Sequence, residues 1–203
     1  PTVRALAYHA VAVRSSFCHS GYHLSLENPS GFLGLNRLSS AWDFSMFAMC
    51  SIDWKTRLPI QYENPLNGTG YLNFARKLKT IGLDNGIECN QSHAPFPVSC
   101  AGIRSVLKKA IECTAEAGGK ICIIHPDNVK TPEENAEMYF ELLPFAKEHG
   151  IIICTENMWN WDGNNDHATP AACSHHDDFV AHLKAVNDPN FAACLDIGHA
   201  EMK

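Results

Sequence analysis

Five residues that can bind a metal ion or move a proton stand at or just beyond the ends of short apolar runs. They are His93, His125, Glu156, Asp196 and His199. The runs at 122–124 and 151–155, for example, lead directly into His125 and Glu156. Imidazole and carboxylate groups together are typical ligands of divalent Zn, Mn, Co or Fe, whereas an all-oxygen set would favour Mg or Ca. The residue types therefore point to a metal centre with acid–base capacity.

These apolar runs belong to a regular alternation of helix and strand from about residue 71 onward. Apolar residues spaced by three and four predict helices, and continuous apolar runs predict buried strands. The expected helices are 71–82, 102–118, 131–149 and 174–186, and the expected strands are 86–89, 120–125, 151–155 and 191–197. Repeats of this kind are typical of a parallel α/β fold, whose active sites form at the carboxyl ends of the strands. We therefore expect four consecutive strand ends to bring the five residues to one rim.

Local signals mark the boundaries of two of these helices. Thr131 and Glu134, with a proline between them, form the pattern of a capping box. Pro144 is expected to kink the last turn of the same helix. Ser174 is expected to cap the last helix, with Asp177 near its positive end.

Three other features offer sites of lower specificity. The segment 162–166 resembles the start of a calcium-binding loop, but His167 stands where that loop needs Gly, so we interpret it as a solvated loop. The cluster at 175–178 could bind a metal, but its place behind Ser174 favours a surface helix start. Trp159 lies just beyond Glu156, where its ring can form a pocket wall against the apolar face of a sugar.

Composition excludes several classes of protein. The formal net charge of the 203-residue chain is −6, which gives no general attraction to nucleic acid or anionic lipid. No apolar run approaches the roughly 18 residues of a membrane span. The nine cysteines are odd in number and form no CxxC pair, which indicates reduced core residues of a cytoplasmic protein.

We expect one α/β barrel-like domain over residues 1–203, with regular repeats at 71–203. Residues 1–70 show no such regular alternation, although 31–38 and 44–52 are apolar enough to form strands or helices. A complete (β/α)8 barrel usually needs about 250 residues, so we expect about six βα units, with the last strands missing.

The motifs around the five residues resemble the xylose isomerase-like TIM-barrel superfamily, and within it the sugar phosphate isomerase/epimerase group, which is related to endonuclease IV. The resemblance covers about residues 72–203. It rests on Ser92-His93-Ala94-Pro95-Phe96, Ile124-His125-Pro126, Thr155-Glu156-Asn157-Met158 and Leu195-Asp196-Ile197-Gly198-His199-Ala200. It implies a fold of the (β/α)8 TIM-barrel type.

The resemblance also implies roles for the site residues. Glu156 and Asp196 would coordinate a divalent metal, usually Zn, Mn or Co, and Glu156 would also be the acid–base residue. His199 would contact an oxygen of the substrate, while His93 and His125 would line the pocket. In the endonuclease-like branch, His93 and His125 would instead hold a second metal bridged by Glu156, and His199 would hold a third.

The function implied is a metal-dependent isomerase or epimerase that acts on a small sugar or sugar phosphate through an enediolate. Two alternatives remain: an endonuclease IV-like phosphodiesterase on abasic DNA, and an inactive truncated family member. The loops after His93, His125 and Glu156 contain almost no Lys or Arg, so we expect no nucleic-acid partner. We expect no membrane partner either, and the sequence leaves homo-oligomerisation open.

Overall fold

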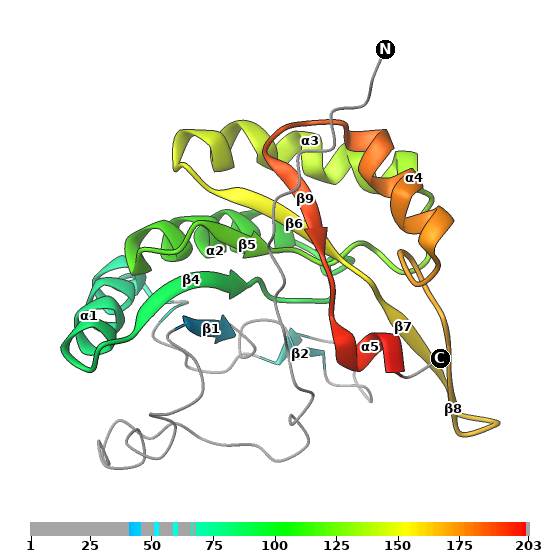
Figure 1. Ribbon diagram of the computed structural model, residues 1–203, viewed down its shortest axis with the longest axis horizontal. Helices are drawn as coiled ribbons and strands as arrows, with labels where there is room; N and C mark the ends of the chain where they lie inside the picture. Colours follow the sequence, from blue (N-terminus) through cyan, green and yellow to red (C-terminus); the bar gives the residue numbers. More distant parts are fainter. Residues whose placement is uncertain (1–40, 46–50, 53–58, 61–65, 67, 202–203) are drawn as a thin grey trace.

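A parallel five-stranded sheet forms the centre of the computed structural model, which describes residues 41–45, 51–52, 59–60, 66 and 68–201 (Figure 1). Its strands are β1 (Ala41–Ser45), β4 (Glu88–His93), β5 (Ile121–Ile123), β6 (Ile152–Glu156) and β9 (Phe191–Cys194). They lie in that order, and every neighbouring pair is parallel. The sheet therefore grows by one strand at a time along the chain, as in a βα barrel. A separate antiparallel pair joins β2 (Ser51–Ile52) to β3 (Pro59–Ile60).

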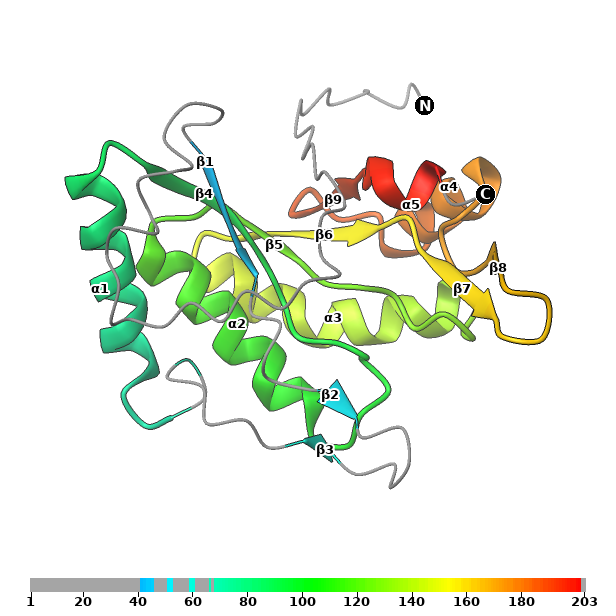
Figure 2. The same ribbon diagram turned by 90° about the horizontal axis from the view of Figure 1, so that it is seen from below.

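Helices connect the strands and lie side by side along the sheet (Figure 2). They are α1 (Tyr71–Asp84), α2 (Ile103–Ala117), α3 (Pro132–Glu148) and α4 (His176–Val186). A short helix, α5 (Ile197–Glu201), follows β9. Each of the first three pairs of consecutive helices is in contact, so the helices form one layer outside the sheet. The predicted parallel α/β class is confirmed.

The core lies between the helices and the sheet, and Tyr139 of α3 is at its centre. This residue is fully buried, and its hydroxyl donates a hydrogen bond to the carbonyl of Ile124 at 3.1 Å. The same oxygen lies 3.0 Å from the hydroxyl of Thr155, and the ring centroid lies 4.5 Å from that of Phe191. One side chain thus connects α3 with the ends of β5 and β6 and with β9.

The capping signals agree with the structure at α3 and differ from it at α4. The hydroxyl of Thr131 accepts the Glu134 N–H at 3.3 Å, and the Glu134 carboxylate accepts the Thr131 N–H at 2.8 Å. The expectation for Ser174 is wrong, because the helix begins one residue later, with His175 as its N-cap. The Ser174 hydroxyl instead accepts the N–H of Ala171 at 3.1 Å, which stabilises the turn before the helix.

Residues 159–170 also differ from expectation. They form a β-hairpin of β7 (Trp159–Asp162) and β8 (His167–Pro170), and only its turn corresponds to the expected solvated loop. Strand β4 runs to His93, further than predicted. The expected element at 31–38 and most of the one at 44–52 lie outside the described residues.

The seven cysteines in the described part of the chain are all free. Burial raises the pKa of Cys154 to about 12, so this thiol stays protonated at neutral pH. Cys18 and Cys50 lie outside the described residues. Among the helices that the structure describes, none is long and apolar enough to cross a bilayer.

Candidate functional site

The carboxyl ends of β4, β5, β6 and β9 share one edge of the sheet, because neighbouring strands are parallel (Figure 1). This edge carries all five residues singled out in the sequence. His93 and Glu156 are the last residues of β4 and β6, and His125 lies two residues beyond the end of β5. Asp196 follows β9, and His199 lies in α5. The parallel sheet therefore brings them together as the strand spacing predicts.

Three of these side chains form a buried group, which we call the dihistidine group: His93, His125 and Glu156. The two Nε2 atoms lie 2.7 Å apart, and each lies 3.3 Å from Oε2 of Glu156. All three side chains are at most 7% exposed. Three ligand atoms from three neighbouring strand ends therefore face one another out of contact with bulk water.

Hydrogen bonding and burial suit the two histidines to bind a cation. Nδ1 of His93 lies 2.7 Å from the carbonyl of Ala94, which can only accept a hydrogen bond, so Nδ1 donates to it and Nε2 is the nitrogen that faces the group. Burial lowers the pKa of His125 to about 4, against the opposing effect of Glu156. At neutral pH His125 is therefore uncharged, the form in which histidine binds metals.

Glu156 also belongs to a second group, which we call the Asp–His group: Glu156, Asp196 and His199. Their ligand atoms all lie within 4.8 Å of one another. Nδ1 of His199 is 3.2 Å from Oε1 of Glu156, and the backbone N–H of His199 donates to Oδ1 of Asp196 at 3.0 Å. Glu156 thus stands between the two groups, with one oxygen facing each.

The environment of Glu156 fits a cation. Burial alone would raise the pKa of this carboxyl, but the imidazoles of His125 and His93 outweigh that effect and hold it well below its usual range. The carboxylate therefore stays charged although it is only 1% exposed. Neither of its oxygens has a well-aligned hydrogen bond within the described residues. Because a buried charge without aligned hydrogen bonds is costly, and two imidazoles lie beside this one, the donor set suits a divalent N/O-ligated metal.

Trp159 lies beside this site on the hairpin that follows β6. Its ring centroid is 6.1 Å from that of His199, at an interplanar angle of 65°. Trp161 packs edge-on against Trp159 at 6.1 Å and is 52% exposed. The hairpin therefore extends an aromatic surface outward from the Asp–His group.

Sequence reasoning assigned no role to two residues that shape the site. Asn157 exchanges two hydrogen bonds with the backbone of Asp196. Phe96 lies 4.8 Å from the ring of His125 and 5.7 Å from that of His93. Both stand within motifs beside site residues, and that adjacency is the one sequence signal that could have found them.

A further group of Cys173, Asp178 and His182 also has ligand atoms within 4.8 Å of one another. However, Nδ1 of His182 lies 2.9 Å from the carbonyl of Asp178, and its Nε2 lies 3.1 Å from Nδ2 of Asn135. Burial raises the pKa of Cys173 to about 12, so its thiol stays protonated. Both imidazole nitrogens are thus engaged in hydrogen bonds and the thiol is protonated, so we interpret the group as structural.

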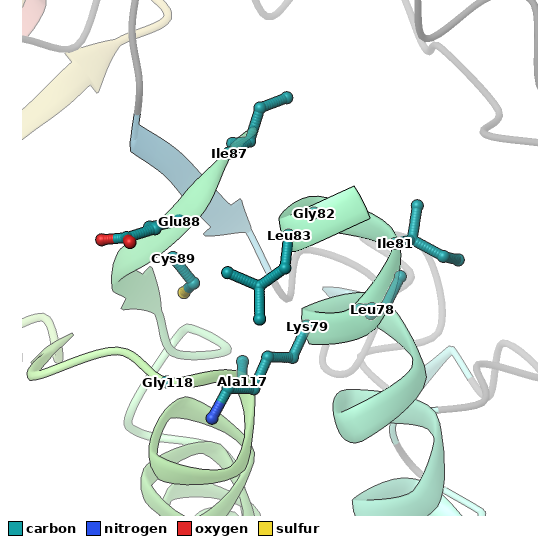
Figure 3. A pocket seen from close by; sticks show the side chains of 10 residues that line it. All are labelled: Leu78, Lys79, Ile81, Gly82, Leu83, Ile87, Glu88, Cys89, Ala117 and Gly118. Carbon is teal, nitrogen blue, oxygen red and sulfur yellow. The ribbon is translucent and has the colours of Figure 1, made fainter. Parts of the chain in front are cut away.

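A cavity lies at the opposite end of β4, between α1 and the end of α2 (Figure 3). It is mostly apolar, with Lys79 and Glu88 as its charged members. None of the five site residues lines it. In βα barrels this amino-terminal end serves stability, whereas the chemistry lies at the other edge.

Comparison with known proteins identifies the family. Residues 37–203 match the family model described as "Xylose isomerase-like TIM barrel". The chain belongs to this family. The TIM-barrel class expected from the sequence is therefore confirmed, and the two ligand groups lie at the edge where barrels of this class hold their active sites.

Solved structures of similar fold agree with this assignment. A D-tagatose 3-epimerase-like protein is 19% identical with a TM-score of 0.57, over 82% of this chain and 59% of that one. An L-ribulose 3-epimerase is 16% identical with a TM-score of 0.52, over 70% and 50%. A xylose isomerase domain protein from Planctomyces limnophilus is 15% identical with a TM-score of 0.53, over 78% and 64%. The chain thus spans between half and two thirds of these structures. No curated protein matches the sequence.

Proposed function

We propose that this chain carries the metal site of a sugar isomerase or epimerase that acts on a small ketose or its phosphate. The observation that supports this most directly is the position of Glu156, charged and buried between two sets of metal ligands at the strand ends. Two structural neighbours, an L-ribulose 3-epimerase and a D-tagatose 3-epimerase-like protein, support a ketose as the substrate class.

In this proposal the Asp–His group holds a divalent Zn, Mn or Co ion through Glu156 and Asp196. A bound ion supplies Lewis acidity, which polarises the carbonyl and hydroxyl oxygens of a sugar. Glu156 moves the proton on the adjacent carbon, and His199 hydrogen-bonds a substrate oxygen. His93 and His125 line the same pocket as hydrogen-bonding groups, and Trp159 packs against the apolar face of the sugar ring.

A second candidate is a metal-dependent phosphodiesterase of the endonuclease IV kind. The dihistidine group favours it, because His93, His125 and Glu156 form a second set of converging ligands. The net charge of −6 argues against a polyanionic substrate, which needs a basic surface. Cleavage of a duplex containing one abasic site, without proton exchange on ketoses, would support this candidate over the first.

We also propose that the chain forms one α/β domain in a reducing compartment such as the cytoplasm. The seven free cysteines among the described residues support this placement, because oxidising compartments favour disulfides.

Metal-dependent proton exchange tests the proposed function. The chain is stripped with a chelator and then given Mn²⁺, Co²⁺ or Zn²⁺ in D₂O with a panel of ketopentoses and ketohexoses. We expect deuterium to enter the carbon next to the carbonyl of at least one sugar only when metal is present, as NMR can measure. Exchange that is equal in stripped and loaded protein would contradict metal dependence, and no exchange with any sugar would contradict the ketose assignment.

Trp159→Ala tests the sugar-facing wall. Because the ring lies beside His199 but carries no proton-transfer group, its loss should weaken substrate binding by about 1 kcal/mol or more and leave the chemical step nearly unchanged. We expect KM to rise about 5- to 10-fold with little change in kcat, measured by the same exchange assay. Trp161→Ala is the matched control, and an equal rise in KM there would assign the effect to the hairpin as a whole.

A further inference from the structure

We propose that Asn157 is a positioning residue that holds Asp196 and His199 in place beside Glu156. The inference rests on the proposed function for its meaning, but its geometry stands on its own. Asn157 follows Glu156 directly, and its contacts reach both other members of the group, Asp196 and His199. One residue therefore connects the end of β6 to the segment that carries the remaining ligands.

The side chain of Asn157 acts on the backbone of Asp196. Its Nδ2 donates to the Asp196 carbonyl at 2.9 Å, and its Oδ1 accepts the Asp196 N–H at 2.7 Å. An amide presents one donor and one acceptor side by side, so it can satisfy both backbone groups of one residue, as a neighbouring strand would. A side chain without both functions cannot make this pair.

This pair of hydrogen bonds lies just beyond the point where the backbone pairing of β6 and β9 ends. The last paired residues of β6 and β9 are Glu156 and Cys194, and Asp196 lies two residues further along the chain. The Asn157 side chain thus continues the connection between the two strands after their backbone pairing stops. Asn157 and Asp196 are only 4% and 5% exposed, so water cannot readily replace the Asn157 amide as the hydrogen-bond partner of the Asp196 backbone.

The backbone of Asn157 orients the third member. Nδ1 of His199 lies 2.8 Å from the Asn157 carbonyl, which can only accept, so Nδ1 carries the proton. This hydrogen bond holds the ring at one angle, with Nδ1 also 3.2 Å from Oε1 of Glu156. A hydrogen bond that fixes the tautomer and angle of a ligand or substrate-binding histidine is a common support of metal sites.

Asn157→Ala and Asn157→Asp test the inference by NMR on the full chain. In Asn157→Ala, hydrogen exchange of the Asp196 amide should be at least about tenfold faster, because its acceptor is gone. The ¹⁵N shifts of the His199 ring should also change, although the Asn157 carbonyl remains, because the Asp196 carboxylate that accepts the His199 backbone N–H is no longer held in place. Asn157→Asp keeps the acceptor, so the Asp196 amide should stay protected. Affinity for Mn²⁺ should fall about 10- to 100-fold in Asn157→Ala.

Asn135→Ala is the matched control. Asn135 is also buried and makes the same pair of hydrogen bonds with an aspartate backbone, that of Asp127, at 2.8 and 3.1 Å. Its loss should lower thermal stability as Asn157→Ala does, but leave the Asp196 amide and the His199 ring unchanged.

The outcomes separate this inference from the proposed function. Unchanged Asp196 exchange and His199 shifts in folded Asn157→Ala would overturn the positioning role, and so would equal changes in Asn135→Ala. If the unmodified chain binds no metal, the proposed function fails, while the exchange rates still decide whether Asn157 holds the group.

Discussion

Glu156→Gln is expected to lower metal-dependent proton exchange on a ketose by roughly 10²–10⁴-fold, the usual contribution of an acid–base residue. Glutamine has nearly the shape of glutamate, so the buried packing at this position is kept. The amide cannot take up a proton from carbon, and it removes the one negative charge that both ligand groups share. Affinity for Mn²⁺ or Co²⁺, measured by competition with a chromophoric chelator, should fall together with the rate.

Glu141→Gln is the control for this substitution. Its carboxylate is 60% exposed and pairs with Arg104 on the surface of α3, away from the strand ends. We expect unchanged exchange and metal affinity there. If Glu156→Gln retains full exchange, Glu156 is not the base, and if it retains full metal affinity, the ligands lie elsewhere.

Tyr139→Ala is expected to be among the most destabilising single substitutions, with a loss of about 3–5 kcal/mol in the free energy of unfolding. The side chain is fully buried, packs on Phe191 and bonds to the end of β5. Truncation leaves a cavity between α3 and the strands β5, β6 and β9, which these elements cannot fill by moving together. Urea unfolding followed by circular dichroism measures the change.

Tyr139→Phe separates packing from hydrogen bonding. It keeps the ring but removes the hydroxyl, which leaves the Ile124 carbonyl without this partner. We expect a loss of about 1–2 kcal/mol, well below that of Tyr139→Ala. Equal losses in the two variants would show that the hydroxyl rather than the ring dominates.

The helices were predictable where local interactions decide them. Apolar spacing predicted a helix at 102–118, and α2 spans Ile103–Ala117, because its buried stripe repeats every three to four residues. The capping box of Thr131 involves groups only three residues apart, so its sequence pattern was sufficient. Ser174 shows the limit of such signals, since its hydroxyl had a competing partner in the preceding turn.

The hairpin at 159–170 was missed for a related reason. Its strands are only four residues each, and their polar turn resembled an isolated loop. Short antiparallel pairs depend on cross-strand contacts, here Trp159 with Pro170, which a pattern along one segment does not contain.

The chemical types at the site and the sheet edge that carries them followed from the residues and their spacing alone. Parallel strands place their carboxyl ends together whatever the details of packing, so His93, His125, Glu156, Asp196 and His199 had to approach one another. Three properties became visible in the folded chain alone: Glu156 lies between two groups, burial keeps His125 neutral, and the Asn157 side chain bonds the backbone of Asp196. These properties depend on side-chain directions and exclusion of water across four strands, which no single segment of sequence specifies.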